Sequence, residues 1–199
     1  MIDNSKHFHN AVYFDTLGCA KNVCDSQAME ENLKISGFKI VDDAKYCDAI
    51  ILNTCAFIEA AIQESIDTFF DYKNYYTEKP IVVVGCLPSR YDKELEKSLP
   101  EASAFLKCNE EDKLAETLTS LGLTPELGKT DEANEIAEAQ SFAYVKISEG
   151  CNRNCSYCMI PKIRGKYKSF SYVEIERDVY KAQSLGAKEI ILVAQDCGV

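Results

Sequence analysis

Three short apolar runs in the first half of the chain are each followed, within a few residues, by a cysteine. The pairs are Ala11–Thr16 with Cys19, Asp48–Thr54 with Cys55, and Ile81–Gly85 with Cys86. The second and third runs are continuously apolar, which is typical of strands buried in a parallel sheet. Residues at helical spacing separate the runs, so 11–121 predicts alternating strands and helices. Such alternation indicates an α/β fold with helices on both faces of a parallel sheet.

The remaining elements of this first half follow from the same patterns. Further strands are expected at Phe38–Val41 and Ala104–Leu106, and helices over 23–35, 58–69 and 114–121. A short helix around Leu95 and Leu99 is expected to open at Ser89 or Arg90. Gly37 marks the expected end of the first helix.

The position of these three cysteines predicts where they meet. The carboxyl ends of parallel strands lie along one edge of the sheet, where ligands bind. Cys19, Cys55 and Cys86 are therefore candidate ligands of one metal cluster. The other four cysteines outside the second half's triplet, Cys24, Cys47, Cys108 and Cys197, are expected to act as small buried hydrophobic residues.

The second half begins a new unit. Gly122, Pro125, Gly128 and many acidic residues indicate a linker, and we expect an amino-terminal domain at 1–125, a linker at 126–140 and a second, incomplete domain at 141–199. Strands are expected at Phe142–Ser148 and Lys188–Ala194. Between them, Ser171 and Glu174 form a capping-box pattern, which predicts a helix with an apolar stripe of Ile175, Val179, Ala182 and Leu185.

A second group of cysteines is closely spaced after the first of these strands. Cys151, Cys155 and Cys158 are four and three residues apart, so their thiolates can converge from one loop. Three thiolates can bind three irons of a four-iron, four-sulfur cluster and leave the fourth iron open. A structural zinc site would normally have four ligands from two CxxC pairs. The iron–sulfur interpretation is therefore favoured over zinc.

Composition and charge limit the cellular setting and the partners. The amino terminus is polar, and no apolar run approaches the ~20 residues of a membrane span, so we expect a cytoplasmic protein without membrane contact. The 199 residues contain ten cysteines, which in the cytoplasm are expected to bind metals or take part in catalysis. The formal charge of −10 disfavours a general nucleic-acid binder. Residues 141–199 carry +3 and residues 1–140 carry −13. The basic residues Lys162, Arg164, Lys166 and Lys168 could contact a ligand or an acidic surface, or could form a solvated strand or loop.

The CxxxCxxC loop after a strand resembles the radical S-adenosylmethionine (SAM) superfamily. That resemblance implies a partial (βα) barrel whose cluster lies at the carboxyl ends of the strands. SAM would chelate the open iron and be cleaved on reduction to a 5′-deoxyadenosyl radical, with Cys151, Cys155 and Cys158 as cluster ligands. Tyr157, just before the third cysteine, would lie beside the adenine of SAM.

The amino-terminal motifs are similar to those of methylthiotransferases. The segments are Leu17-Gly-Cys19-Ala-Lys-Asn22, Asn53-Thr-Cys55-Ala-Phe-Ile58 and Gly85-Cys86-Leu87. In this family that domain holds a second four-iron cluster, here implied at Cys19, Cys55 and Cys86, which delivers sulfur. Gly-Cys-Ala-Lys-Asn and Cys-Ala-Phe-Ile resemble the RimO-like branch, as do the stretches Ala143–Cys151, Ile160–Gly165 and Ala194–Asp196.

The resemblance to the RimO-like branch implies an enzyme that adds a methylthio group to the β-carbon of an aspartate in a small-subunit ribosomal protein. It also implies an electron donor such as flavodoxin or ferredoxin. The alternatives are a tRNA-adenosine methylthiotransferase (MiaB-like), which the acidic amino-terminal half makes less favoured, and a non-catalytic iron–sulfur module.

This sequence departs from the family pattern in three places. Gln27 stands where the RimO-like branch usually has Glu, and Cys197 stands where threonines are usual. The remainder of the barrel and a small carboxyl-terminal β-barrel domain are missing. We therefore expect this chain to be a fragment that is inactive alone.

Overall fold

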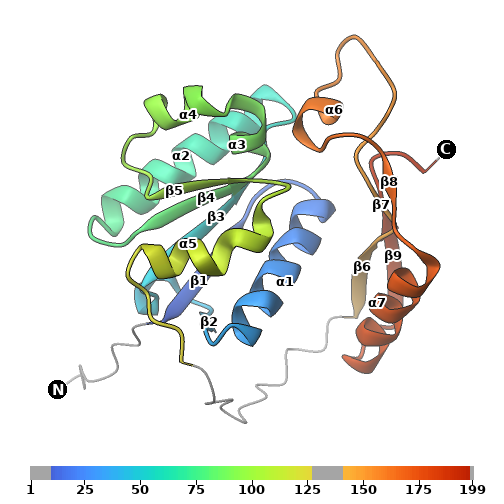
Figure 1. Ribbon diagram of the computed structural model, residues 1–199, viewed down its shortest axis with the longest axis horizontal. Helices are drawn as coiled ribbons and strands as arrows, with labels where there is room; N and C mark the ends of the chain where they lie inside the picture. Colours follow the sequence, from blue (N-terminus) through green and yellow to red (C-terminus); the bar gives the residue numbers. More distant parts are fainter. Residues whose placement is uncertain (1–9, 127–140, 198–199) are drawn as a thin grey trace.

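A computed structural model describes residues 10–126 and 141–197, and its centre is a five-stranded parallel sheet (Figure 1). The strands stand in the order β2-β1-β3-β4-β5. Their bounds are β1 Ala11–Thr16, β2 Lys39–Val41, β3 Ala49–Thr54, β4 Ile81–Gly85 and β5 Ala104–Lys107. Every residue of β3 and β4 is buried, which explains why these two strands have continuous apolar sequences. The expected α/β fold is confirmed.

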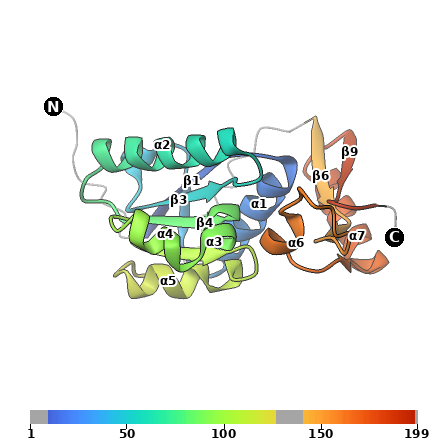
Figure 2. The ribbon, with the colours of Figure 1, turned by 90° about the horizontal axis from the view of Figure 1, so that it is seen from above.

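Helices cover both faces of this sheet (Figure 2). One face packs on α1 (Ala20–Ile35) and α5 (Leu114–Ser120), and the other on α2 (Glu59–Tyr75), α3 (Cys86–Tyr91) and α4 (Lys93–Ser98). Two 3-10 turns, η1 (Ala44–Tyr46) and η2 (Glu111–Lys113), complete this amino-terminal unit, residues 10–126. Alternate side chains of β3 divide between the faces: Ile50 and Leu52 pack with Phe69 of α2, and Ile51 packs with Met29 of α1.

The strand order reverses at β1. The chain leaves β1 through α1 to β2 on one side, and then returns to form β3 on the other side of β1. In open α/β sheets such a reversal creates a crevice beyond the carboxyl ends of the strands. The loops that carry Cys19 and Cys55 start at the two strands that flank this point.

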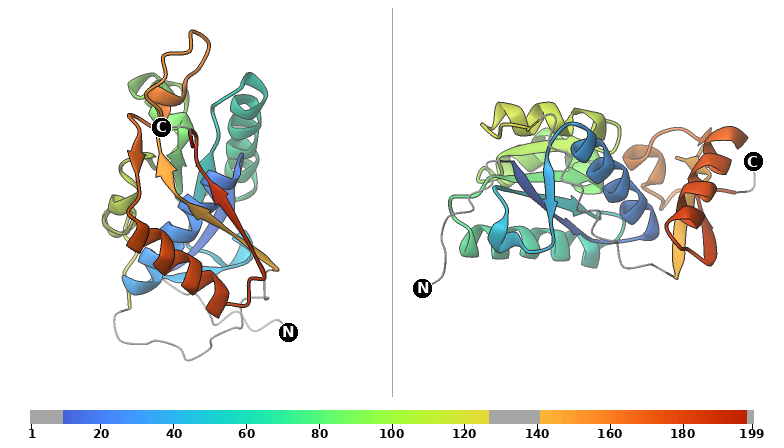
Figure 3. Two further views of the ribbon diagram at one scale, coloured as in Figure 1. Left: turned by 90° about the vertical axis from the view of Figure 1, so that its right-hand side faces the viewer. Right: turned by 90° about the horizontal axis from the view of Figure 1, so that it is seen from below.

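The carboxyl-terminal unit, residues 141–197, is smaller and lies beside α1 (Figure 3). Its strands β6 (Phe142–Lys146) and β9 (Glu189–Val193) pair in parallel and are connected through α7 (Tyr172–Ser184). A second, antiparallel pair joins β7 (Ser148–Glu149) to β8 (Lys168–Ser169), and α6 (Ile160–Ile163) lies against α3. The expected capping box is present, since Ser171 Oγ accepts from Glu174 N–H and the Glu174 carboxylate accepts from Ser171 N–H.

Several expected boundaries are corrected. The first helix begins at Ala20 rather than residue 23, because Cys19 is its extended N-cap residue. The single helix expected from Ser89 or Arg90 is two helices, divided at Asp92, whose φ of 48° lies in the left-handed region and interrupts the helix. The strand expected over 142–148 is two strands, β6 and β7. Leu185, expected in the apolar stripe of α7, is 60% exposed.

The proposed linker lies almost wholly outside the described residues, which stop at 126 and resume at 141. Residue 126 itself still contacts the amino-terminal unit, since Glu126 N–H donates to Gly37 O at 2.9 Å, and Leu123 is buried in the core. His7 and His9, to which the sequence assigns no role, also lie outside the described residues. Among the helices of the described residues, none is long and apolar enough to cross a membrane.

Candidate functional site

Cys19, Cys55 and Cys86 lie together at the carboxyl edge of the parallel sheet. Cys19 ends the turn after β1, Cys55 directly follows β3, and Cys86 opens α3 after β4. Because these strands are parallel neighbours, their carboxyl ends share one edge.

Asn22 lies between two of these cysteines. The Cys19 thiol donates to Asn22 Oδ1 at a sulfur–oxygen distance of 3.7 Å, and the Cys86 sulfur lies 3.9 Å from the same oxygen. The Asn22 side chain is fully buried, and its Nδ2 donates to Leu17 O and Thr54 O at 2.9 Å each. The amide group therefore fixes the loops after β1 and β3 relative to one another and directs its oxygen toward two sulfurs.

Gly18 brings the third cysteine close to the first loop. A Cβ atom at position 18 would lie 2.6 Å from Cys55 Cβ and 3.0 Å from Cys55 Sγ, and Gly18 has a φ of +94°. Any other residue would clash with Cys55 and strain the backbone. On its other side, Cys55 is held by Ser65, whose hydroxyl accepts from Cys55 N–H and donates to Cys55 O.

The Cys55 and Cys86 thiols differ in acidity. The pKa of Cys86 falls to about 6, first because Cys108 donates a hydrogen bond to its sulfur and then because the Arg164 guanidinium lies beside it. Burial raises the pKa of Cys55. The pKa of Cys108 rises, because it is the donor in the pair with Cys86. The surroundings of Cys86 therefore favour its thiolate, the form that binds metals.

Cys108 is the residue at this edge that the sequence interpretation missed. It directly follows β5 and is partly buried beside Cys86, with its backbone N–H donating to Ser89 Oγ at 2.9 Å. The rule that selected the other three cysteines, a position just after a parallel strand, applies to it equally. Cys24 and Cys47 are buried, as expected, and burial raises the pKa of each to about 11, whereas Cys197 is exposed and does not fit the expected buried role.

The second triplet lines a hollow in the carboxyl-terminal unit. The hollow has a volume of about 380 Å³ and lies where the loop after β7 meets the residues after β9. Its lining residues are Cys151, Arg153, Cys155, Cys158, Ile160, Gln195 and Asp196. The two segments are joined by the Gly150 N–H, which donates to Gln195 Oε1 at 3.0 Å, and by an ion pair of Arg153 with Asp196 at 2.6 Å.

Two residues of this loop, Gly150 and Tyr157, are not part of the hollow's lining. A Cβ at Gly150 would lie 2.4 Å from Lys166 O, so the neighbouring backbone requires a glycine there. Tyr157 is 84% exposed and does not line the hollow. Its contact with SAM stays a prediction.

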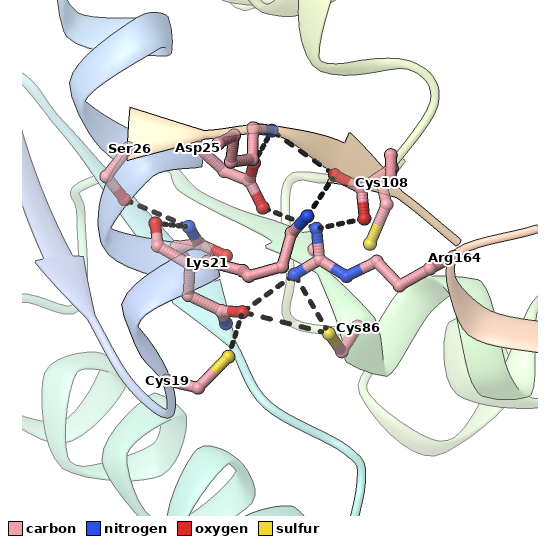
Figure 4. Close-up of polar contacts among 12 residues, drawn as sticks. Cys19, Lys21, Asp25, Ser26, Cys86, Cys108 and Arg164 are labelled. Carbon is pink, nitrogen blue, oxygen red and sulfur yellow. Dashed lines mark hydrogen bonds and ion pairs between the residues drawn. The ribbon is translucent and has the colours of Figure 1, made fainter. Parts of the chain in front are cut away.

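Charged side chains from both units form a buried cluster next to Cys86 (Figure 4). Asp25 of α1 pairs with both Lys146 of β6 and Arg164, which follows α6, and Lys21 of α1 pairs with Glu149 at 3.3 Å. Arg164 was expected at a ligand or in solvent together with its neighbouring lysines. Its side chain is instead only 3% exposed, while Lys162, Lys166 and Lys168 are exposed.

The residues present fit iron–sulfur clusters better than a single metal ion. Within residues 10–126 and 141–197, no three His, Cys, Asp or Glu side chains converge closely enough to hold one ion. A four-iron cluster does not need such convergence, because each cysteine binds a different iron. Thiolates are the ligands that these clusters use, and each triplet occupies one loop cluster or one sheet edge.

Two family models match the chain. Residues 11–107 match the family described as uncharacterized protein family UPF0004, and residues 145–197 match the radical SAM superfamily. The first match covers all five strands of the central sheet, and the second covers the cysteine-lined hollow. The amino-terminal unit is thus similar to UPF0004 and the carboxyl-terminal unit to the radical SAM superfamily, a similarity that implies an iron–sulfur cluster and SAM.

The chain is also RimO-like along nearly its whole length. The ribosomal protein uS12 methylthiotransferases RimO of Clostridium kluyveri, Clostridioides difficile and Aquifex aeolicus are 44%, 38% and 41% identical to it over 194, 197 and 181 residues. These alignments cover 91%, 93% and 91% of this chain, but only 43%, 44% and 40% of the respective relatives. The chain thus spans less than half the length of the curated relatives that it matches.

Proposed function

We propose that this chain is part of a radical SAM methylthiotransferase that inserts a methylthio group at the β-carbon of an aspartate in the small-subunit ribosomal protein uS12. The observation that carries the proposal is the similarity to RimO proteins across both units, each of which contains a group of three cysteines. The proposed setting is the cytoplasm, and the proposed electron donor is a flavodoxin or ferredoxin.

Each triplet is proposed to hold one four-iron cluster. The hollow of Cys151, Cys155 and Cys158 would hold the cluster that binds SAM, and Cys19, Cys55 and Cys86 would hold the auxiliary cluster for sulfur delivery. When bound, the first cluster and SAM supply the radical that activates the substrate carbon. Support for the assignment comes from the thiolate character of Cys86 and from the open hollow, whose Gln195 and Asp196 offer polar groups to a polar ligand.

The chain's own residues would prepare these two sites. Asn22 holds the loops after β1 and β3 together, and Gly18 allows Cys55 to approach the loop of Cys19. The Arg153–Asp196 pair fixes the residues after β9 across the hollow from the cysteine loop. These contacts reduce the freedom of the six cysteines before a cluster binds, which is the preorganisation that a metal site requires.

Iron and acid-labile sulfide per chain test the proposal directly. After anaerobic reconstitution we expect about eight irons per chain, which is two four-iron clusters. Replacing Cys19, Cys55 and Cys86 by alanine should leave about four, and so should replacing Cys151, Cys155 and Cys158. The matched control replaces Cys24, Cys47 and Cys197 by alanine and should retain about eight. Little iron with stoichiometric zinc would contradict the proposal.

The SAM site and the substrate need separate tests. SAM should change the electron paramagnetic resonance spectrum of the reduced chain that keeps only Cys151, Cys155 and Cys158, and no change would favour a non-catalytic iron–sulfur module. Mass spectrometry of uS12 and of tRNA, after incubation with a protein that spans the full length of the relatives, distinguishes the substrates. A methylthio group on tRNA alone would overturn the assignment to uS12.

A further inference from the structure

Arg164 connects the two units at the proposed auxiliary site. It belongs to the carboxyl-terminal unit, but its guanidinium donates to three groups of the amino-terminal unit, while Glu149 of its own unit lies 3.8 Å from Nη1. Nη2 donates to Asn22 Oδ1 at 2.7 Å and to Cys86 Sγ at 3.4 Å, and Nη1 pairs with Asp25 (Figure 4). The Arg164 side chain is 3% exposed and that of Asp25 is 1% exposed.

The burial of this arginine requires a reason. A guanidinium remains charged at any pH that a protein survives, and removing it from water is costly unless it is paired. Asp25 pairs with both Arg164 and Lys146, and Glu149 is a second carboxylate, 3.8 Å from Arg164 Nη1 and 3.3 Å from Lys146 Nζ. The Cys86 sulfur is a further acceptor that Arg164 reaches, at 3.4 Å.

We propose that Arg164 is a positioning residue that completes the auxiliary site from the other unit, by hydrogen-bonding the Cys86 sulfur and stabilising the negative charge that the site gains on reduction. The inference rests on the proposed function of the auxiliary cluster and on the hydrogen bonds of Arg164 to Asn22 and Cys86. Hydrogen bonds to ligand sulfurs and net local charge set the reduction potentials of iron–sulfur clusters. Reduction by an external donor such as dithionite adds one electron and neither forms nor breaks a bond, so a nearby fixed positive charge favours the reduced form.

The experiment uses the chain with Cys151, Cys155 and Cys158 replaced by alanine, so that one iron–sulfur site remains. Potentials are measured by dithionite titration followed by electron paramagnetic resonance. Arg164→Met keeps the aliphatic stem but removes the charge and the donors. We expect it to shift the oxidised-to-reduced equilibrium about tenfold toward the oxidised form, which is about 59 mV more negative for one electron. Arg164→Lys should give a smaller shift, because the charge remains while the forked contact is lost.

The matched control is Arg177→Met, because Arg177 is an exposed arginine of α7 that pairs with its neighbour Asp178. The reduction potential of the Arg177→Met variant should equal that of the parent chain. Equal potentials for Arg164→Met and Arg177→Met would overturn the proposal. The iron content of each variant is measured first, so that loss of the cluster is not mistaken for a change in potential.

A second readout does not depend on the cluster. In the iron-free chain, Arg164→Met should speed amide hydrogen exchange in the first turns of α1 and in α6, which the Arg164 contacts join. Arg177→Met should not. Absence of iron in the parent would overturn the proposed auxiliary cluster and the effect on its potential, whereas unchanged exchange in Arg164→Met would overturn the positioning role itself.

Discussion

The two units obtain their stability in different ways. In the amino-terminal unit, all residues of β3 and β4 are buried between helices on both faces. In the carboxyl-terminal unit, no residue of α7 is buried, and Tyr172, Tyr180 and Leu192 are more than half exposed. The described part of this unit is fixed to α1 largely by charged contacts. The amino-terminal unit therefore has a hydrophobic core of its own, whereas the described part of the carboxyl-terminal unit depends on the surface against which it packs.

The largest effect should follow a cavity in the amino-terminal core. Phe69 of α2 is fully buried against the sheet, so Phe69→Ala should lower the free energy of unfolding by ~3–5 kcal/mol. Val173→Ala, at a position of α7 that is 73% exposed, should change it by less than ~0.5 kcal/mol. Urea unfolding followed by circular dichroism measures both, and equal losses would contradict the comparison.

The next largest effect should follow removal of the carboxylate between the units. Asp25→Ala removes the buried carboxylate that pairs with Arg164 and Lys146 and leaves these two cations with Glu149, which should cost ~3 kcal/mol in the same urea experiment. The control is Glu31→Ala, because the Glu31–Lys181 pair also joins the units but is half exposed on both sides. It should cost less than ~1 kcal/mol. If the two variants lose equal stability, burial of the charges does not decide the strength of this interface.

A smaller and pH-dependent effect is expected at Glu111. Burial, with Asp25 adding to it, raises the pKa of Glu111 to about 8, and its Oε1 has no hydrogen-bond partner in the described structure. The unfolded chain releases this proton near pH 4.5, whereas the folded chain retains it to about pH 8. Stability should therefore fall as pH rises between these values and stay level above them.

Glu111→Gln should remove that slope, which is ~1.4 kcal/mol for each pH unit between the two pKa values, and should therefore stabilise the chain at pH 8 relative to the parent. The measurement is urea unfolding at pH 5, 6.5 and 8. Glu116→Gln, at an exposed position on the neighbouring α5, controls for loss of a surface charge. A slope retained in Glu111→Gln would show that another group produces it.

The smallest effect concerns the start of α7. Ser171→Ala removes the hydroxyl that accepts from Glu174 N–H but keeps the backbone N–H that donates to the Glu174 carboxylate, and it should destabilise this helix by ~1 kcal/mol, which is about a fivefold increase in local amide exchange. Ser184→Ala at the other end of α7 removes only the hydroxyl's bond to Lys181 O and should have less effect. Hydrogen exchange of the α7 amides measures both effects. Equal exchange rates in the two variants would show that the Ser171 cap does not stabilise this helix.

The sequence predicted best what local patterns determine. The bounds of β1 and β4 agree with the structure, and the apolar runs predicted the sheet edge at which Cys19, Cys55 and Cys86 lie. The break between α3 and α4 could not be predicted, because Asp92 is a non-glycine residue in a left-handed conformation and carries no glycine signal. Tertiary contacts also determine the role of Arg164. The local sequence does not distinguish it from its exposed basic neighbours, and only its pairing with Asp25 of α1 buries it. Cys108 directly follows β5 and so meets the strand-end rule, although we expected it to act as a small buried hydrophobic residue.

Asp25 and Arg164 are 139 residues apart in the sequence, which gives their pairing a consequence for protein synthesis. Ribosomes add ~5–20 residues per second, so Arg164 follows Asp25 by roughly 10–30 seconds. β1 precedes Asp25, the strands β2 to β5 are synthesised in that interval, and domains near the amino terminus fold first. During that time the sheet edge that carries Cys86 is exposed to water, and Arg164 can cover it only after this residue has left the ribosome.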